Sequence, residues 1–494
     1  MGGFDIAYRP AYCEDADLAF RLREAGYEVW LQPLSRVLHY EGKTHGRDLE
    51  KGVKAHQTVN MRRFAKRWKA VLAAHRPNGQ SPDQEANRAA RDRILVLDAT
   101  TPAPDQDSGS FITFRMLMAL RKLGYQITFV PQHNYAYNAT YTTPLQRLGI
   151  ECLYFPYFRN ITDVLDFRSD FDIVLGYRFN VLDKVYDEIR RRIPAARIIF
   201  HNVDLHYLRE EREAALEGSR SKKIAAAITK AAELELIAKV DCTIVHTPVE
   251  ATIIKKELPI DNIVVFPYIA DIYRTQIAFE DRYDILFLGG FGHPPNIDAV
   301  KHFLRSIWPS LLERLPEQAR FVIVGASPPE SVKALAGSRV VVTGYAEDLQ
   351  PHFDAARVFV APIRYGAGIK GKVIQSLCYG TPSVVTSIAA EGIGLASGRE
   401  TIIADEDEEF IKQILHLYSD RVLWHRLQAA GYEFVEQNFS WKRCFDLCTN
   451  VFDTADATWL GRHERMLRSR LKELLAEPDS TDSRLAKFEA TCAR

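Results

Sequence analysis

Two lysines stand in the first turns of an expected helix, directly after a glycine-rich turn. Gly366 and Gly368 precede Lys370 and Lys372, and the apolar run at 358–361 before them predicts a buried strand. Glycines let a ligand approach the backbone closely, and a helix start offers free N–H groups and positive potential. The lysine charges add to both effects, so this unit predicts a site for a phosphate or a diphosphate. The alternative is a pair of solvated lysines at a helix start.

A second anion-facing turn is expected after the apolar run at 93–99. Asp107 precedes Ser108, Gly109 and Ser110, and a helix is expected over 110–123. Such a turn can bind an anion through its N–H groups, or it can simply cap the helix. The residues alone leave both interpretations open.

Polar side chains also gather after the strand expected at 197–201. The cluster consists of His201, Asp204, His206 and Arg209. Side chains at the carboxyl ends of parallel strands face the ligand crevice of an open sheet. A lone histidine is usually structural, but two histidines with an acid and an arginine on one loop favour contacts with ligand hydroxyls. Tyr177 and Arg178 end another expected strand and are predicted to line the same cleft.

Length and composition set broad limits. A chain of 494 residues is too long for one core, so two or three domains are expected. Lys plus Arg and Asp plus Glu each number 64, and this balance argues against a dedicated nucleic-acid binder. No apolar run reaches the roughly 18–20 residues of a membrane span. The seven cysteines show no CxxC pair, which favours buried free thiols in a reducing, cytosolic setting.

Two series of expected strands, with amphipathic helices between them, organise most of the chain. The first series lies at 93–99, 126–131, 151–155, 172–177, 197–201, 242–246 and 262–266. The second lies at 283–288, 320–324, 339–343, 358–361, 383–386 and 401–403. Strands that alternate with helices predict parallel, doubly wound sheets. The fold class is therefore α/β with two tandem Rossmann-like domains, a hinge at 267–281, and a ligand cleft between the facing strand ends.

Residues 93–450 resemble a GT-B glycosyltransferase of the retaining family 4 group. The resemblance rests on five motifs in the expected order, at 287–298, 321–325, 342–345, 361–372 and 380–392. It implies an N-terminal acceptor domain at 93–272, a nucleotide-sugar donor domain at 273–440 and C-terminal helices at 441–494. It also implies that the anomeric configuration is retained and that neither a metal nor a cofactor is required.

The resemblance assigns roles to particular residues. Those expected to bind the donor are Gly289, Gly290, Gly366, Gly368, Lys370, Lys372, Gln375 and Gly392. Those expected to act in catalysis are His201, beside the donor sugar, with Asp204, His206 and Glu391. Ser108, Gly109, Ser110 and Arg209 are expected to bind the acceptor or the edge of the diphosphate. Ala367 and Gln375 stand where the family usually has two glutamates, and Gln375 can still bond a ribose hydroxyl without a charge.

The expected activity is transfer of a sugar from a nucleotide-diphosphate donor to a hydroxyl acceptor, in bacterial surface polysaccharide or glycolipid synthesis. The expected partners are the nucleotide sugar and a saccharide or lipid-linked acceptor, with no nucleic acid. The expected location is the cytoplasm, and a peripheral association with the inner face of the membrane is left open. The alternatives are a nucleotide-sugar epimerase with the same fold, or a non-catalytic binding or scaffold protein.

Residues 1–75 resemble the end of the catalytic domain of inverting family 2 glycosyltransferases, which have a GT-A fold. The matching residues are Gly2–Asp5, Glu14, Asp15, Gly26–Tyr27 and His39, with a helix expected at 14–24, a short strand at 28–32 and a helix at 51–72. The resemblance implies that Asp15 is a catalytic base with Glu14 beside it, and that His39 lies near a metal-diphosphate. Because that fold needs a nucleotide-binding half that does not precede Met1, the segment is expected to be an inactive remnant, followed by a linker at 76–92.

Overall fold

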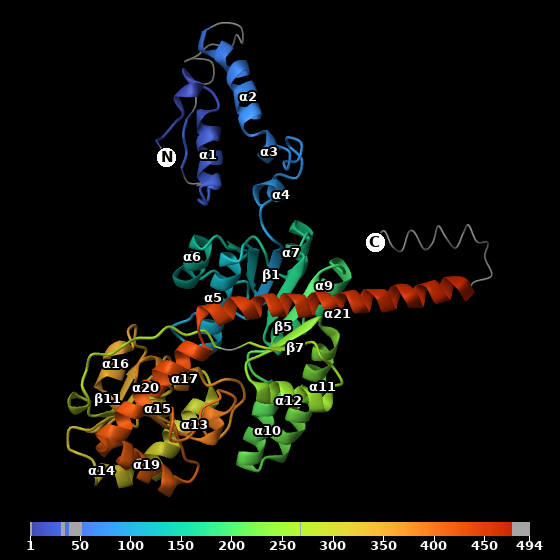
Figure 1. Ribbon diagram of the computed structural model, residues 1–494. Helices are drawn as coiled ribbons and strands as arrows, with labels where there is room; N and C mark the ends of the chain where they lie inside the picture. The colour runs from blue at the N-terminus through green and yellow to red at the C-terminus, as the bar shows by residue number, and fades with distance from the viewer. Residues whose placement is uncertain (1, 31–34, 39–51, 267, 477–494) are drawn as a thin grey trace. The chain divides into compact units, whose positions relative to one another are not determined.

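Seven apolar runs between residues 93 and 265 form one parallel sheet, sheet A (Figure 1). Its strands are β1 (Arg93–Asp98), β2 (Gln126–Pro131), β3 (Glu151–Cys152), β4 (Ile173–Tyr177), β5 (Arg197–His201), β6 (Cys242–Val245) and β7 (Ile263–Val265). The spatial order is β3-β2-β1-β4-β5-β6-β7. Ile94 of β1 lies opposite Ile127 of β2 and Ile173 of β4. All seven expected strands are confirmed, although β3 is shorter than expected.

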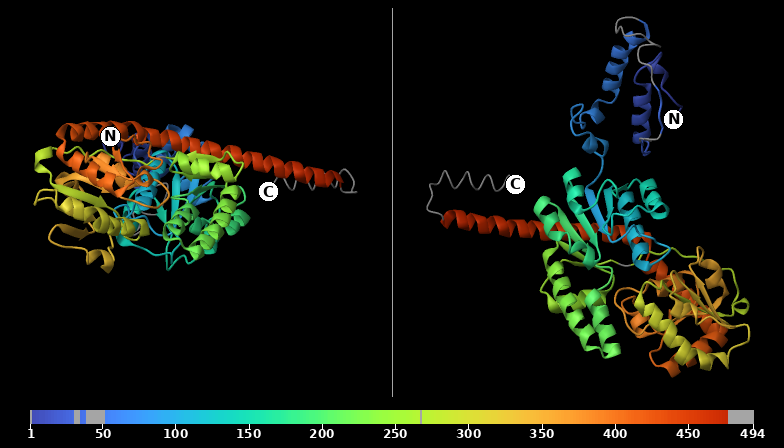
Figure 2. Two further views of the ribbon diagram at one scale, coloured as in Figure 1. Left: turned by 90° about the horizontal axis from the view of Figure 1, so that it is seen from below. Right: turned by 180° about the vertical axis from the view of Figure 1, so that it is seen from behind.

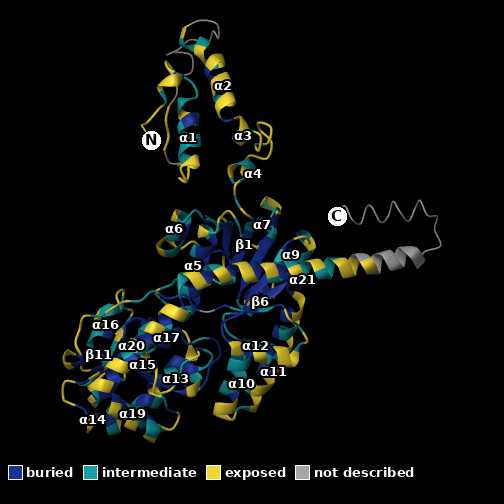
Figure 3. Ribbon diagram, in the orientation of Figure 1, coloured by how far each residue is buried: buried dark blue, intermediate teal, exposed yellow. Residues whose placement is uncertain are grey.

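Six further strands form sheet B, which is also parallel. They are β8 (Asp284–Leu288), β9 (Phe321–Val324), β10 (Val340–Gly344), β11 (Ala356–Ala361), β12 (Ser383–Val385) and β13 (Ile402–Ile403). The spatial order is β10-β9-β8-β11-β12-β13. The residues of the central strands of both sheets are mostly buried, and this explains why they read as continuous apolar runs, whereas the edge strands β3, β7 and β10 are largely half-buried (Figure 3). The predicted pair of doubly wound α/β domains is confirmed.

Helices connect the strands within each sheet. Around sheet A they are α5 (Ser108–Lys122), α6 (Ala139–Arg147), α7 (Ile161–Phe167), α8 (Phe179–Leu182), α9 (Tyr186–Arg192), α10 (His206–Glu217), α11 (Arg220–Lys239) and α12 (Pro248–Glu257). Around sheet B they are α13 (Pro294–His302), α14 (Trp308–Leu312), α15 (Glu330–Lys333), α16 (Gln350–Ala355), α17 (Gly371–Cys378), α18 (Ser387–Ala390), α19 (Asp407–Ser419) and α20 (Arg421–Asn438).

Each sheet has a point at which the strand order reverses. In sheet A the chain proceeds from β1 to β2 on one side and later continues from β4 on the other. In sheet B the corresponding neighbours are β8 and β11. Ligands of open α/β sheets bind outside the carboxyl ends of the strands at such switch points. The loops that follow these four strands are therefore the first place to look for a site.

The last described helix, α21 (Trp441–Ala476), returns from the second domain to sheet A. It packs against α5, β5, β6 and β7, and Figures 1 and 2 show that it crosses the sheet and continues beyond it. Cys444, Cys448, Val451 and Phe452 are buried there among residues of the sheet A core. This part of α21 therefore crosses back to the first sheet domain, and the thiols of Cys444 and Cys448 are buried, as expected for free cysteines.

The computed structural model describes residues 2–30, 35–38, 52–266 and 268–476. The chain divides into two compact units, Met1–Ala89 and Ala90–Arg494, and both sheets belong to the second. Among the described residues, no helix is both long and apolar enough to cross a membrane.

The first unit consists of short helices around one buried acid. Its helices are α1 (Glu14–Glu24), α2 (Ala55–Arg67), α3 (Lys69–Leu72) and α4 (Pro82–Ala86). Asp17 is fully buried and accepts hydrogen bonds from the Tyr8 hydroxyl at 3.1 Å and the Trp68 indole N–H at 2.9 Å. Arg21 pairs with the same carboxylate at 2.8 Å. Asp17 therefore joins the start of this unit to its second helix.

The predictions for this unit are met in part. The helix at 14–24 is confirmed, and the helix expected at 51–72 is present as α2 and α3 with a break at Trp68. No strand forms at residues 28–30, and positions 31–32 of that expected strand lie outside the described residues. Asp15 is exposed and Glu14 half-buried, while His39 lies outside the described residues. The buried acid of the unit is Asp17, two positions after the expected base.

Candidate functional site

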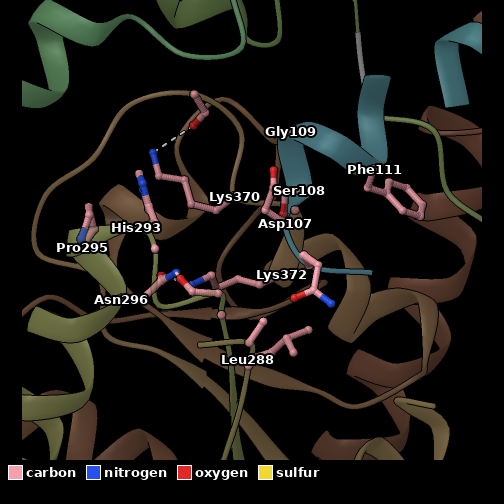
Figure 4. Close-up of a pocket in the computed structure, with 18 of the residues that line it drawn as sticks. Asp107, Ser108, Gly109, Phe111, Leu288, His293, Pro295, Asn296, Lys370 and Lys372 are labelled. Atoms are coloured by element: carbon pink, nitrogen blue, oxygen red, sulfur yellow. Dashed lines mark hydrogen bonds between the residues drawn. The ribbon is translucent and has the colours of Figure 1, made fainter. Parts of the chain in front are cut away.

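Three helices begin at one cavity between the two sheet domains. The cavity has a volume of about 530 Å³, and its lining includes residues at the starts of α5, α13 and α17. Figure 4 shows Asp107, Ser108 and Gly109 at the start of α5, on the opposite side of the cavity from His293 and Asn296 of the α13 start. Each helix start directs positive potential toward the space, so an anion is the natural guest.

The start of α5 is shaped by its capping residue. Asp107 accepts hydrogen bonds from the Ser110 backbone N–H at 2.8 Å and from the Ser110 hydroxyl at 2.7 Å. Ser110 is consequently buried in the cap and does not line the cavity, whereas Ser108 and Gly109 do. The turn is therefore a helix cap, and Ser108 and Gly109 after the capping residue border the cavity.

The turn before α17 needs glycine at Gly368, as expected. Gly368 has φ +69°, and a Cβ there would lie 2.9 Å from the Asp204 Cβ and 3.0 Å from the Val203 carbonyl oxygen. A side chain would therefore push the turn away from the first domain. The close approach brings the loop after β5 and the loop after β11 into direct contact at the cavity.

Lys372 is the most unusual residue of the site. Its ammonium is buried, donates a hydrogen bond to the Asn296 side-chain oxygen, and lies 4.7 Å from the centre of the Phe287 ring. Burial, followed by repulsion from Lys370, lowers the pKa of Lys372 to about 7. Among the residues that the structure describes, no carboxylate forms an ion pair with it. Keeping such a cation buried is unfavourable unless a ligand supplies the missing negative charge.

Lys370 occupies the capping position of α17 and is also buried. Its ammonium donates to the Gly368 carbonyl at 2.9 Å and lies 3.9 Å from a carboxylate oxygen of Glu391. Burial lowers the pKa of Lys370 to about 8. The two lysines thus lie in the second domain at the helix start that the sequence predicted, and both line the cavity.

Arg178 contributes a third cation, from the first domain. It follows β4 with φ +66°, an unfavourable backbone conformation for a residue with a side chain. Its guanidinium donates to the buried carboxylate of Asp98 at 2.9 Å, and Asp98 is the last residue of β1. Asp98 and Arg178 therefore lie at the switch point of sheet A. Lys372 and Asn296 lie in the corresponding place of sheet B, after β11 and β8. Arg178 lines the cavity as expected, but Tyr177 is buried in the core.

The loop after β5 and the first turn of α10 supply a charge-balanced pair to the cavity. Arg209 donates to the carboxylate of Asp204, and both residues line the cavity. Burial alone would raise the pKa of Asp204, but Arg209, His206 and His293 together hold it below its ordinary value. His206 lies behind them, where its ring is 3.7 Å from Glu233 and 3.9 Å from Asp204. His206 orients this loop and does not itself line the cavity.

His201 is not placed where the sequence interpretation put it. Its side chain is fully buried at the end of β5, stacked on Tyr177 with ring centres 4.3 Å apart, and it does not line the cavity. Burial and the neighbouring His246 lower its pKa well below the ordinary value. A neutral histidine inside the sheet core cannot contact a ligand in the cavity as the structure stands. His293 lines the cavity instead, from the turn after β8.

Glu391 and Gly392 also lie beside the cavity and are not part of its lining. The Glu391 carboxylate accepts two hydrogen bonds from Arg212, each of 2.7 Å. Gly392 packs against the first domain, where a Cβ would lie 2.3 Å from the Thr247 Cβ. The structure therefore assigns both residues to the contact between domains.

The remaining predicted donor residues line the cavity. They are Gly289, Gly290, Gly366 and Gln375, and Ala367 lies there too. A Cβ on Gly290 would come within 2.8 Å of the Gln106 carbonyl oxygen, so this glycine permits another close contact between the domains. Sequence reasoning missed His293 and Asn296 as site residues. Their position directly after the Gly289–Gly290 turn, which follows the strand expected at 283–288, was the available signal.

The charged side chains that line the cavity favour an anion over a metal ion as the ligand. Four cationic side chains line the cavity, namely Arg178, Arg209, Lys370 and Lys372, against three carboxylates, Asp105, Asp107 and Asp204. Within the described ranges, no group of three or more His, Cys, Asp or Glu side chains is arranged to hold a metal ion.

Comparison with known proteins agrees with this geometry. Residues 282–420 match the family model described as glycosyl transferases group 1. The matched segment covers sheet B and its loops, including Lys370 and Lys372.

Solved structures share the arrangement of both domains. Sucrose-phosphate synthase from Thermosynechococcus elongatus superimposes with a TM-score of 0.59 at 15% identity, covering 74% of this chain and 100% of that one. Anabaena HepE, solved with UDP and glucose, gives 0.57 at 14% identity, with 74% and 100% covered. A Rickettsia africae glycosyltransferase gives 0.55 at 12% identity, with 74% and 98% covered. The fold of the two sheet domains is GT-B.

One curated relative is named for a cps region. An uncharacterised 44.6 kDa protein in the cps region of Klebsiella pneumoniae is 24% identical over 179 residues, which are 33% of this chain and 46% of that protein. The chain thus spans about half the length of that relative.

Proposed function

We propose that the protein is a glycosyltransferase that moves a sugar from a nucleoside-diphosphate sugar to a hydroxyl acceptor. The observation that carries this proposal is Lys372, a buried cation in a cavity at three helix starts, with no carboxylate paired to it among the described residues. A diphosphate supplies the negative charge that this arrangement lacks. The match of residues 282–420 to group 1 glycosyl transferases supports the same reaction class.

The proposed roles of the cationic residues follow from where negative charge develops during sugar transfer. When the bond between the sugar and the diphosphate breaks, negative charge grows on the departing phosphate. Lys370, Lys372 and the N–H groups at the start of α17 are already in place to stabilise it, without reorganisation during the reaction. Arg178 and the start of α5 approach from the other domain. Residues of both domains therefore surround the leaving group with positive charge.

The finer assignments belong to the proposal as well. Retention of the anomeric configuration and independence from a metal follow from the family 4 resemblance. Asp204 and Arg209, on the first-domain side of the cavity, are the candidates to bind hydroxyls of the acceptor or the sugar. The cps-region relative and the UDP and UDP-glucose complexes of HepE favour a nucleotide sugar and a bacterial polysaccharide or glycolipid acceptor.

Turnover with a panel of nucleotide sugars tests this function. The purified chain is incubated with each nucleotide sugar, with and without saccharide and lipid-linked acceptors, and the products are separated by mass spectrometry. Release of the nucleoside diphosphate with a new glycosidic product supports the proposal, and NMR of that product determines whether the configuration is retained. An interconverted nucleotide sugar would indicate an epimerase instead. If no nucleotide sugar of the panel binds, the proposal fails.

A further inference from the structure

An arginine from the first domain holds a glutamate of the second domain beside the cavity. Arg212 on α10 donates from Nη1 and Nη2 to the two carboxylate oxygens of Glu391, each at 2.7 Å. Nη1 also donates to the carbonyl oxygen of Gly366 at 2.5 Å. Arg212 does not line the cavity. It is nevertheless bonded to the loop that carries Lys370.

Two cations, Arg212 and Lys370, lie near Glu391, and only Arg212 is hydrogen-bonded to it. The Lys370 ammonium lies 3.9 Å from a Glu391 oxygen, beyond hydrogen-bond distance, while both Arg212 bonds are short. The guanidinium fork matches a carboxylate with two parallel bonds, whereas an ammonium acts as a single point charge. Arg212 therefore satisfies Glu391, and the one hydrogen bond that Lys370 makes within the described structure is to the neutral Gly368 carbonyl.

We propose that Arg212 is a positioning residue, which keeps Lys370 available to an anionic ligand by occupying Glu391 and fixing the Gly366 carbonyl. Without the guanidinium, the nearest cation to Glu391 is Lys370. That carboxylate would then pair with Lys370 and compete with the ligand for it. The inference rests on the proposed function only in that the ligand is taken to be a nucleoside diphosphate.

The charged groups around Lys370 allow a second test of this role, through the pKa of Lys370. They are Glu391, Arg212, Glu250, Asp204 and Lys372, and the ring of His293 is near as well. Glu391 raises the pKa of Lys370 and Arg212 lowers it, while burial has the largest effect and brings the pKa to about 8. Loss of Arg212 removes one repulsion and frees the attraction of Glu391. The pKa of Lys370 is then expected to rise.

The test compares Arg212→Gln, Glu391→Gln and the double variant by calorimetric titration with UDP, GDP and ADP. We expect Arg212→Gln to bind the preferred nucleotide about tenfold more weakly, while Glu391→Gln and the double variant stay within about threefold of the unmodified protein. The matched control is Arg191→Gln, which removes an ion pair with Glu188 on α9, away from the cavity. Circular dichroism and thermal unfolding verify that each variant is folded.

Two further measurements separate positioning from a purely structural ion pair. An ion pair that only held the domains together would make Arg212→Gln and Glu391→Gln equally harmful, and the double variant would not recover binding. Either pattern, or unchanged binding in Arg212→Gln, overturns the inference. Titrations between pH 7 and 10 are expected to show the loss of binding at a higher pH in Arg212→Gln, and an unshifted profile contradicts it. Absence of binding by the unmodified protein would instead refute the proposed function.

Discussion

The ammonium of Lys372 donates a hydrogen bond to the side-chain oxygen of Asn296. The two residues come from helix starts after β11 and β8, the neighbouring strands at which sheet B reverses its order. A neutral amide orients the ammonium without cancelling its charge. The bond therefore presents a buried positive charge at the point of the sheet where ligands bind.

Replacing Lys372 with methionine should stabilise the protein. Methionine fills a similar volume and removes a buried charge that no carboxylate neutralises among the described residues. We expect the midpoint of thermal unfolding at pH 6 to rise by a few degrees, because the lysine is charged at that pH. The control is Lys333→Met, which removes an exposed ammonium paired with Glu330 and should leave the midpoint nearly unchanged. A lower midpoint in Lys372→Met would contradict the assignment of an unneutralised charge.

Nucleotide binding should weaken as the pH rises above about 7.5, where the diphosphate is already fully ionised. Burial holds the pKa of Lys372 at about 7 and that of Lys370 at about 8 in the free protein. A bound diphosphate favours the charged lysines and raises both pKa values, so binding takes up protons. Calorimetry in two buffers of different ionisation enthalpy measures that uptake directly. Proton release on binding, or none, would contradict this account.

Gly325→Ala should disrupt the floor of the cavity. A Cβ at Gly325 would lie 2.0 Å from the Gly289 carbonyl oxygen, and backbone on both sides must move to admit it. We expect a loss of about 3 kcal/mol in the free energy of unfolding, measured by urea denaturation, together with weaker nucleotide binding. Gly292→Ala is the matched control, because a Cβ there meets nothing within 4 Å and Gly292 also lines the cavity. Equal effects of the two substitutions would show that the contact at Gly325 has no such role.

Asp17→Asn should unfold the first unit without changing the site. The buried Asp17 carboxylate accepts hydrogen bonds from Tyr8 and Trp68 and pairs with Arg21, and an amide would remove the ion pair and set its own N–H donors against one of these donor groups. We expect a loss of about 3 kcal/mol or more for this unit, seen as rapid amide hydrogen exchange in α1 and α2. Asp15→Asn alters an exposed side chain and should leave exchange unchanged. Protection of α1 in the Asp17 variant would contradict the assigned role.

The elements of the two sheets were predictable because each strand is a short apolar run bounded by turn residues. The lysines at 370 and 372 were predictable for the same local reason, since a glycine turn and a helix start both lie within a few residues of them. The failures concern contacts between distant segments. His201 ends a strand, but its ring is enclosed by Tyr177 from β4 and His246 after β6, and no local pattern reveals that enclosure.

Glu391 is a second residue whose contacts a local sequence pattern does not reveal. Its place after β12 was expected, but its partner Arg212 lies 179 positions earlier in the chain. Residues 28–30 were expected to begin a short strand at 28–32, yet no strand among the described residues pairs with them. Pairing across long separations depends on the assembled fold, which a single sequence read locally does not contain.

The most direct test of the central claim is nucleoside-diphosphate binding by the unmodified protein and by Lys372→Met. Calorimetric titration with UDP, GDP and ADP at pH 7 should show saturable binding of at least one of them to the unmodified protein. The same titration of Lys372→Met, which is expected to be folded and more stable, should show binding weakened by about tenfold or more. Equal affinities for the two proteins would contradict a diphosphate site built around Lys372.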